Sequence, residues 1–145
     1  MFTTILNKVS SILEANTLIQ EVFKYEAEQF NGDPVAIVIP SSNESDYDTT
    51  EENIRIYAYT VRLFVNRTTR TKEKADEVLR DLVDSIIDDL DVDYTFTGIV
   101  NATGYTFINT FAMPSLWGYS GNEAEYRVAE IDVRCRVSVN LNLIS

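Results

Sequence analysis

The residues best suited to chemistry in this chain are the carboxylates of the run Asp88-Asp89-Leu90-Asp91-Val92-Asp93. Counted from Asp89, they place acids at the first, third and fifth positions of a calcium-binding loop. That loop also needs glycine at its sixth position and glutamate at its twelfth, where this chain has Tyr94 and Val100. The run therefore indicates the polar end of a helix, with weak adventitious cation binding as the alternative.

The chain also lacks the residues on which other common kinds of catalytic centre depend. The chain has no histidine, which removes the most common general base, the usual partner of a serine or cysteine nucleophile, and imidazole metal ligands. Its five glycines form no phosphate-binding pattern. Cys135 alternates in phase with apolar residues, which predicts a small buried side chain. We therefore expect a protein that is not an enzyme and that uses no metal or cofactor.

The acidic charge is concentrated in two segments. Of the net charge of −11, residues 41–53 carry −5 and residues 73–93 carry −7, so the remainder of the chain sums to +1. A solvated loop and a solvated helix face explain this pattern, and so does an acidic surface that faces a partner. The overall balance of 12 basic against 23 acidic residues opposes binding to a nucleic-acid backbone or to an anionic membrane, because both attract lysine and arginine.

Length and composition predict one globular domain over residues 1–145, since 45% of the residues are hydrophobic and 24% are charged. The first residues lack the basic start and apolar core of a signal peptide, and no stretch reaches the ~18 apolar residues of a membrane span. We therefore expect a protein that is made in the cytoplasm, is not exported and has no membrane partner.

Periodicity predicts two helices, at residues 3–15 with Thr3 or Thr4 as N-cap and at residues 72–90 with Thr71 as N-cap. Residues 41–53 lack periodicity and predict a long, mobile acidic loop. A break is expected at 114–118, which contains Pro114 and Gly118. The predicted strands are 20–29, 35–39, 54–65, 94–101, 105–111 and 126–143.

The last predicted strand alternates strictly, so one of its faces should be buried and the other should be wet or at an interface. Arg134 and Arg136 lie on the polar face, which also carries Glu130 and Asp132, and this mixture suits solvent or a subunit contact. Trp117 either anchors a loop on the core or acts as an interface aromatic. The residues predicted to face the core are Ile131, Val133, Cys135, Val137, Val139, Leu141 and Leu143.

The predicted elements disfavour a doubly wound parallel sheet, because helices and strands do not alternate regularly. We expect an α+β fold with an antiparallel or mixed sheet of four to five strands. A long amphipathic helix should pack on one face of this sheet, and a short helix should precede it.

The order of these motifs resembles the tail terminator (tail completion, neck) proteins of long-tailed, siphovirus-like bacteriophages. The resemblance covers nearly the whole chain and rests on structural motifs, without a catalytic signature. The motifs are Asp33-Pro34-Val35-Ala36-Ile37-Val38-Ile39-Pro40-Ser41, the acidic segment from Glu44 to Asn53, Arg55-Ile56-Tyr57, Arg67-Thr68 before residues 75–84, and Trp117-Gly118-Tyr119 before residues 126–131.

The resemblance implies a ring, typically a hexamer, that caps the finished tail tube and provides the surface joined to the head. Its partners would be copies of itself, the tail tube protein and the head-tail connector protein, with DNA only passing through the channel. The protein would reside in the virion tail or neck and assemble in the host cytoplasm. The alternatives are another neck or head-tail connector component, and an acidic inhibitor that mimics DNA.

A head-to-tail contact repeated around a closed rotation would build such a ring. For subunit or partner contacts the sequence offers the acidic segment, the two outward arginines and the tryptophan. These candidate interface residues are Glu44, Asp46, Asp48, Glu51, Glu52, Arg134, Arg136 and Trp117.

Charge reversal at Arg134 and Arg136 should weaken assembly without unfolding the monomer, because both side chains are expected outside the core. Native mass spectrometry of the double variant Arg134→Glu/Arg136→Glu should show fewer assembled rings than the unchanged protein, and its circular dichroism spectrum should be the same. Rings that form normally would remove these two residues from the interface.

Overall fold

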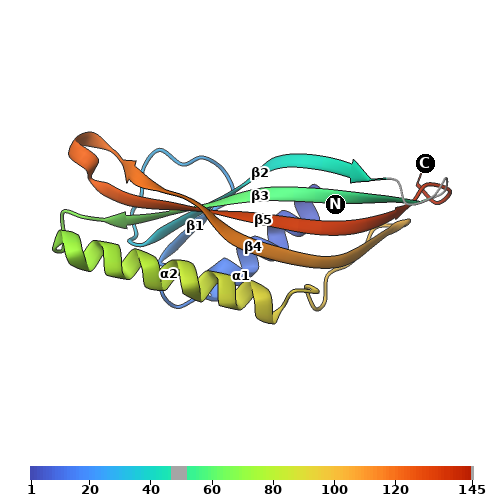
Figure 1. Ribbon diagram of the computed structural model, residues 1–145, viewed down its shortest axis with the longest axis horizontal. Helices are drawn as coiled ribbons and strands as arrows, with labels where there is room; N and C mark the ends of the chain where they lie inside the picture. The colour runs from blue at the N-terminus through green and yellow to red at the C-terminus, as the bar shows by residue number, and fades with distance from the viewer. Residues whose placement is uncertain (47–51, 145) are drawn as a thin grey trace.

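The computed structural model describes residues 1–46 and 52–144 and shows an α+β fold (Figure 1). The strands lie in the order β1-β2-β3-β5-β4, with β1 parallel to β2 and every other pair antiparallel. This arrangement confirms the predicted mixed sheet. The elements are α1 (Phe2–Ala15), β1 (Glu21–Phe23), β2 (Val35–Asp46), β3 (Glu52–Asn66), α2 (Lys72–Val92), β4 (Tyr105–Ser120), the short 3-10 helix η1 (Asn122–Ala124) and β5 (Tyr126–Asn140).

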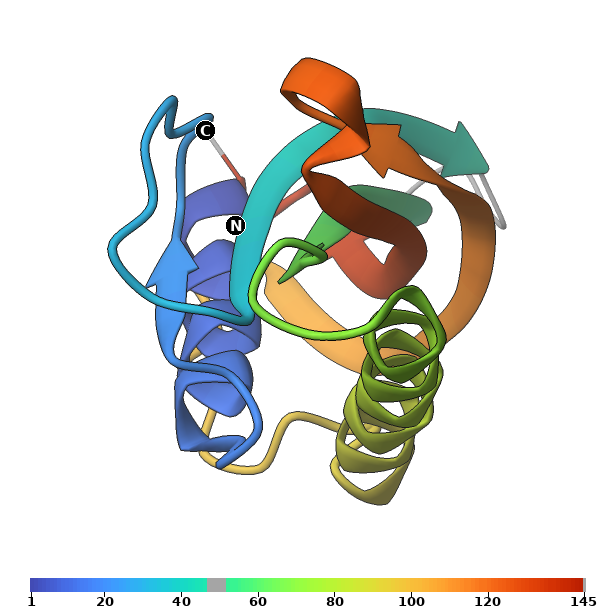
Figure 2. The same ribbon diagram turned by 90° about the vertical axis from the view of Figure 1, so that its left-hand side faces the viewer.

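The core joins the apolar side chains of both helices to one face of the sheet. Alternation along β3 and β5 sends every second side chain to this face. The alternate residues from Tyr57 to Val65 are buried there, and so are the predicted inward residues from Ile131 to Val139. Leu13 of α1 and Leu79 and Leu90 of α2 belong to the same cluster. In Figure 2, α1 lies beside β1 on one flank and α2 lies near β4 on the other.

Polar contacts fix the two helices. Thr71 caps α2 as predicted, since its hydroxyl oxygen accepts from the Lys74 amide at 3.1 Å. The predicted threonine cap of α1 is wrong: the helix starts directly after Met1, without a side-chain cap. The hydroxyl of the buried Tyr59 donates to the carbonyl of Phe2 at 2.7 Å, which ties the start of α1 to β3.

The predicted loop at 41–53 is wrong at both ends, because residues 41–46 continue β2 and residues 52–53 belong to β3. Asp46 pairs with Ile54 in an antiparallel register that carries one shift, between Pro40 and Ser42. β3 is kept extended by its pairing with β5, so its other side presents free backbone N–H and C=O groups. A polar segment without periodicity can form hydrogen bonds with these groups and become a strand. Residues 47–51 lie outside the described part of the chain.

Two predicted strands are also wrong. From residues 20–29 only Glu21–Phe23 pairs, and the segment after it turns away so that Phe30 packs on a second, smaller cluster with Phe64. Residues 94–101 form turns, in which Phe96 takes a positive φ of 52° and buries its ring against Phe107 at 4.7 Å.

The predicted break at 114–118 is wrong, since β4 runs through it with a register shift between Pro114 and Leu116. The final strand ends at Asn140, which leaves Leu143 exposed instead of buried. Among the described residues, no helix combines the length and the hydrophobicity that a membrane crossing requires.

Replacing Leu79 by alanine should destabilise the protein by about 2–5 kcal/mol, because this fully buried side chain would leave a cavity between α2 and the sheet. The matched control is Val92→Ala on the same helix, whose side chain is 86% exposed and whose loss should change the unfolding free energy by less than about 0.5 kcal/mol. Urea unfolding followed by circular dichroism measures both. Equal losses in the two variants would contradict this account of the core.

Candidate subunit interface

The acid run at the end of α2 has structural partners. A carboxylate oxygen of Asp89 accepts from the Asn16 amide at 2.8 Å, which links the ends of the two helices. Asp93 accepts from the Thr97 amide at 2.8 Å and pairs with the Lys8 ammonium at 3.3 Å. Desolvation opposes ionisation of Asp93, but the bonds from Thr97 and Lys8 outweigh it and lower its pKa. No group of potential metal ligands gathers anywhere in residues 1–46 and 52–144.

Cys135 is fully buried, as predicted, in the core face of β5. Burial raises the pKa of its thiol to about 12, with a smaller opposing effect from the Thr110 hydroxyl, which lies 3.4 Å from the sulfur. A thiol in this setting remains protonated at neutral pH, so it behaves as a small apolar side chain.

The two predicted arginines lie on the outer face of the sheet, which we define as the face opposite the helices. Arg134 pairs with Asp132 of the same strand at 3.0 Å and is about one-third exposed. Arg136 is exposed and makes no ion pair within the described part of the chain. Nearby on this face, Arg62 of β3 bonds to Glu130 at 2.9 Å. Among the described residues of the outer face, Arg136 is thus an arginine whose charge is available to a partner.

The predicted acidic residues belong to strands β2 and β3 and to the segment between them. Glu44 and Asp46 lie in β2 and Glu52 begins β3, whereas Asp48 and Glu51 fall outside the described residues. The strand register aligns Glu44 with Ile56, and Ile56 with Arg136, so this acid and this base occupy aligned positions of the sheet.

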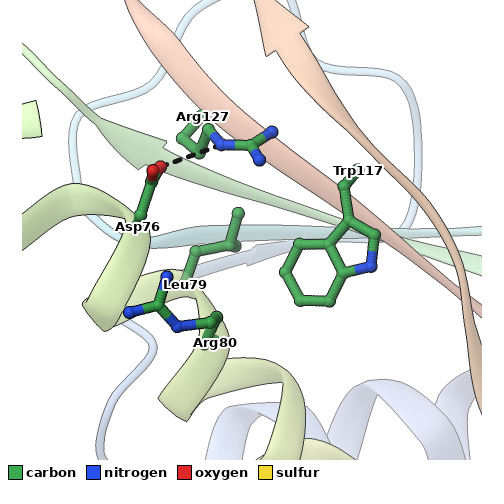
Figure 3. A pocket seen from close by; sticks show the side chains of 5 residues that line it. All are labelled: Asp76, Leu79, Arg80, Trp117 and Arg127. Atoms are coloured by element: carbon green, nitrogen blue, oxygen red, sulfur yellow. Dashed lines mark hydrogen bonds and ion pairs between the residues drawn. The ribbon is translucent and has the colours of Figure 1, made fainter. Parts of the chain in front are cut away.

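Trp117 lies in β4 and not in a loop. Its side chain is 43% exposed and lines a cavity of about 180 Å³ together with Leu79 and Arg80 of α2 (Figure 3). Across this cavity, Arg127 binds Asp76 at 2.9 Å, and its guanidinium lies 4.5 Å from the Tyr119 ring. The tryptophan is therefore set between the sheet and α2, with part of its ring available to a partner.

Several of the large apolar side chains that are exposed in the described residues lie on β4, the strand at one edge of the sheet. Its large side chains are between 38% and 58% exposed, and the strand pairs on one side only, with β5. Natural edge strands are usually protected by charged residues, because a free edge invites pairing with another chain. We call this set the β4 surface: Phe111, Met113, Leu116, Trp117 and Tyr119.

The register shift at Pro114 decides which face of the sheet each part of the β4 surface takes. Trp117 and Tyr119 lie opposite Ala129 and Arg127 of β5, on the face that the helices cover. Phe111 and Met113 lie opposite Arg134 and Asp132 of β5, on the outer face. The extra residue, Ser115, puts Leu116 opposite Glu130, so this leucine joins the same face. A bulge commonly re-aims side chains in this way. The result is an apolar row of Phe111, Met113 and Leu116 beside the outer-face charges.

The sequence contains a signal for this surface that periodicity does not detect. Residues 94–122 include no aspartate, glutamate, lysine or arginine, although a quarter of the chain is charged. All of β4 falls within this uncharged stretch. An uncharged strand can be one that is buried on both sides, but the exposure of β4 excludes that explanation here. Contiguous exposed apolar side chains are a common mark of interaction sites.

No protein-family profile matches this chain, and no curated protein matches it. Among solved structures, the fold is similar to that of a chain in the virion of a native gene transfer agent particle, with a TM-score of 0.58. The two chains share 12% sequence identity, and the match covers 92% of this chain and 94% of that chain. The likeness therefore concerns the fold of the whole domain.

Cys135 should resist a maleimide reagent in native buffer at pH 8, where a pKa of about 12 leaves a thiolate fraction on the order of 10⁻⁴. In urea the thiol should react completely, because unfolding exposes it and returns its pKa to about 8.5. Mass spectrometry of the labelled protein measures both rates. Rapid labelling of the folded protein would contradict the buried position.

Proposed function

We propose that this chain is a structural protein of a phage-like virion that acts by binding other protein subunits, without catalysing a reaction. The observation that carries the proposal is the β4 surface, an uncharged and exposed edge strand with large apolar side chains. Interfaces are enriched in such aromatic and methionine side chains and are poor in charge at their centres. The fold shared with a chain of the gene transfer agent virion supports a place in such a particle.

Within that class we propose a tail terminator. Copies of the chain form a ring, most simply a hexamer, through a head-to-tail contact that includes the β4 surface. One side of the ring meets the last subunits of the tail tube and ends its growth, and the other side meets the head-tail connector. The assembled ring sits at the neck of the virion, and DNA only passes through its channel. The sequence motifs described above support this finer assignment.

The acidic exposed side of α2 favours one alternative from a different class. Glu73, Asp81, Asp84, Asp88 and Asp91 are all exposed. A protein that mimics DNA would present such a row of carboxylates to a basic enzyme. It would act as a monomer or dimer and would compete with DNA, so its mass and its binding behaviour separate it from a ring.

The double variant Phe111→Asp/Met113→Asp should raise the protein concentration needed for assembly by at least about tenfold, because it places two charges at the centre of an apolar contact. Native mass spectrometry across a concentration series, with and without tail tubes, measures this shift. The matched control is Val92→Asp/Val100→Asp, which adds the same charge at two positions more than 75% exposed and outside β4.

Equal assembly of both double variants would remove β4 from the contact. A wild-type protein that remains monomeric even on tail tubes, and that competes with DNA for a basic protein, would favour the inhibitor instead.

A further inference from the structure

A second surface lies apart from the β4 surface, where the chain turns from β4 into β5. A groove of about 560 Å³ runs between residues 27–31, which follow β1, and the hairpin tip at residues 120–126. These two segments are far apart in the sequence, and both line the groove. The groove is lined by Ala27, Glu28, Gln29, Phe30, Asn31, Phe64, Ser120, Gly121, Glu125 and Tyr126.

The floor of the groove is aromatic. The Phe30 ring lies 4.8 Å from Phe64 and 5.5 Å from Tyr126, and the last two rings meet edge-on at 6.0 Å. Phe30 and Tyr126 are only half-buried, so part of each ring remains open to the groove. Such a cluster offers a large apolar side chain a preformed place to pack.

The rim of the groove is acidic. Glu28 and Glu125 line it, and Glu123 is exposed at the hairpin tip. None of these three carboxylates has an ion-pair partner in the described part of the chain. In contrast, the nearby Arg70 is already paired with Asp33 at 2.8 Å. Burial raises the pKa of Tyr126, and the charges of Glu125 and Asp33 raise it further, as expected at a site of negative potential.

The hairpin tip that forms one wall is held in a strained conformation. Glu123 and Ala124 both have φ values of 54°, which costs a residue other than glycine on the order of 1–3 kcal/mol. Arg67 supports this shape, because its guanidinium donates to the Ala124 carbonyl and its amide donates to the Glu125 carbonyl, each at 2.8 Å. Arg127 adds a bond to the Gly118 carbonyl at 2.6 Å. These bonds come from the chain itself, so this shape of the wall needs no partner to form.

We infer that this groove binds an extended segment of a partner protein that carries a large apolar side chain flanked by lysine or arginine. The apolar side chain packs on the ring cluster of Phe30, Phe64 and Tyr126. The flanking cations meet Glu28 and Glu125, whose charges are unpaired without a partner. A fixed wall and preformed floor lower the entropy cost of binding such a segment. The inference does not depend on ring formation, since none of the residues of the β4 surface lines this groove.

The test uses three synthetic peptides of equal length as probes, with the cores Lys-Phe-Lys-Phe-Lys, Lys-Ser-Lys-Ser-Lys and Glu-Phe-Glu-Phe-Glu. Nuclear magnetic resonance titration of the full chain should show binding of the first peptide only, with shifts at Phe30, Glu125 and Tyr126. Binding should weaken as salt is raised, because screening reduces the attraction between exposed charges.

The double variant Glu28→Lys/Glu125→Lys should lose at least about tenfold in affinity for the first peptide, because the rim then repels its cations. The matched control, Asp81→Lys/Asp84→Lys on the exposed side of α2, makes the same change in net charge and should retain the affinity. Equal losses in both variants would show that overall charge alone drives binding and would overturn the inference. So would equal binding of the acidic peptide, or shifts outside the groove.

Discussion

The structure depends on the pairing of β3 with β5. These two strands pair without a register shift from Glu52 opposite Asn140 to Asn66 opposite Tyr126. Their alternation then brings two apolar rows side by side on one face, and this face meets α1 and α2. A slip of one residue would turn every one of these side chains to the other face. The continuous apolar alternation of β5 specifies the register against such a slip.

The pairing of β3 with β5 also determines where the remaining strands can join the sheet. β2 joins the free side of β3, where it is partly covered by β1, and β4 joins the free side of β5. β4 therefore becomes an edge, and it is also the strand that falls in the uncharged stretch. The acidic side of α2 supplies charge that favours solubility elsewhere on the molecule. An edge without charge on an otherwise acidic protein is a surface suited to assembly.

The helix α2 and the strand β5 could be predicted because the spacing of their own apolar residues indicates the structure that each adopts. The α2 helix has an unbroken apolar stripe and a threonine cap, and β5 has strict alternation. The extension of β2 through residues 41–46 could not be predicted, because its pairing is set by β3 and not by its own residues. Pro114 signals a break, but an edge strand needs no amide donor on its free side and can absorb proline at a bulge. Trp117 and Arg136 were identified as candidates from the sequence, whereas Phe111 and Met113 were not.

The fold class, the core faces of α2 and β5 and the burial of Cys135 follow from local spacing and the hydrophobic effect, so the amino-acid sequence is enough to predict them. The sequence also shows where the charged residues are and that residues 94–122 contain none. The position of this stretch at a sheet edge, and the meeting of Glu28 and Glu125 in one groove, appear only in the folded domain. Both outcomes depend on contacts between segments far apart in the chain. Such contacts are selected by the packing of the whole domain, so no local pattern of residues encodes them.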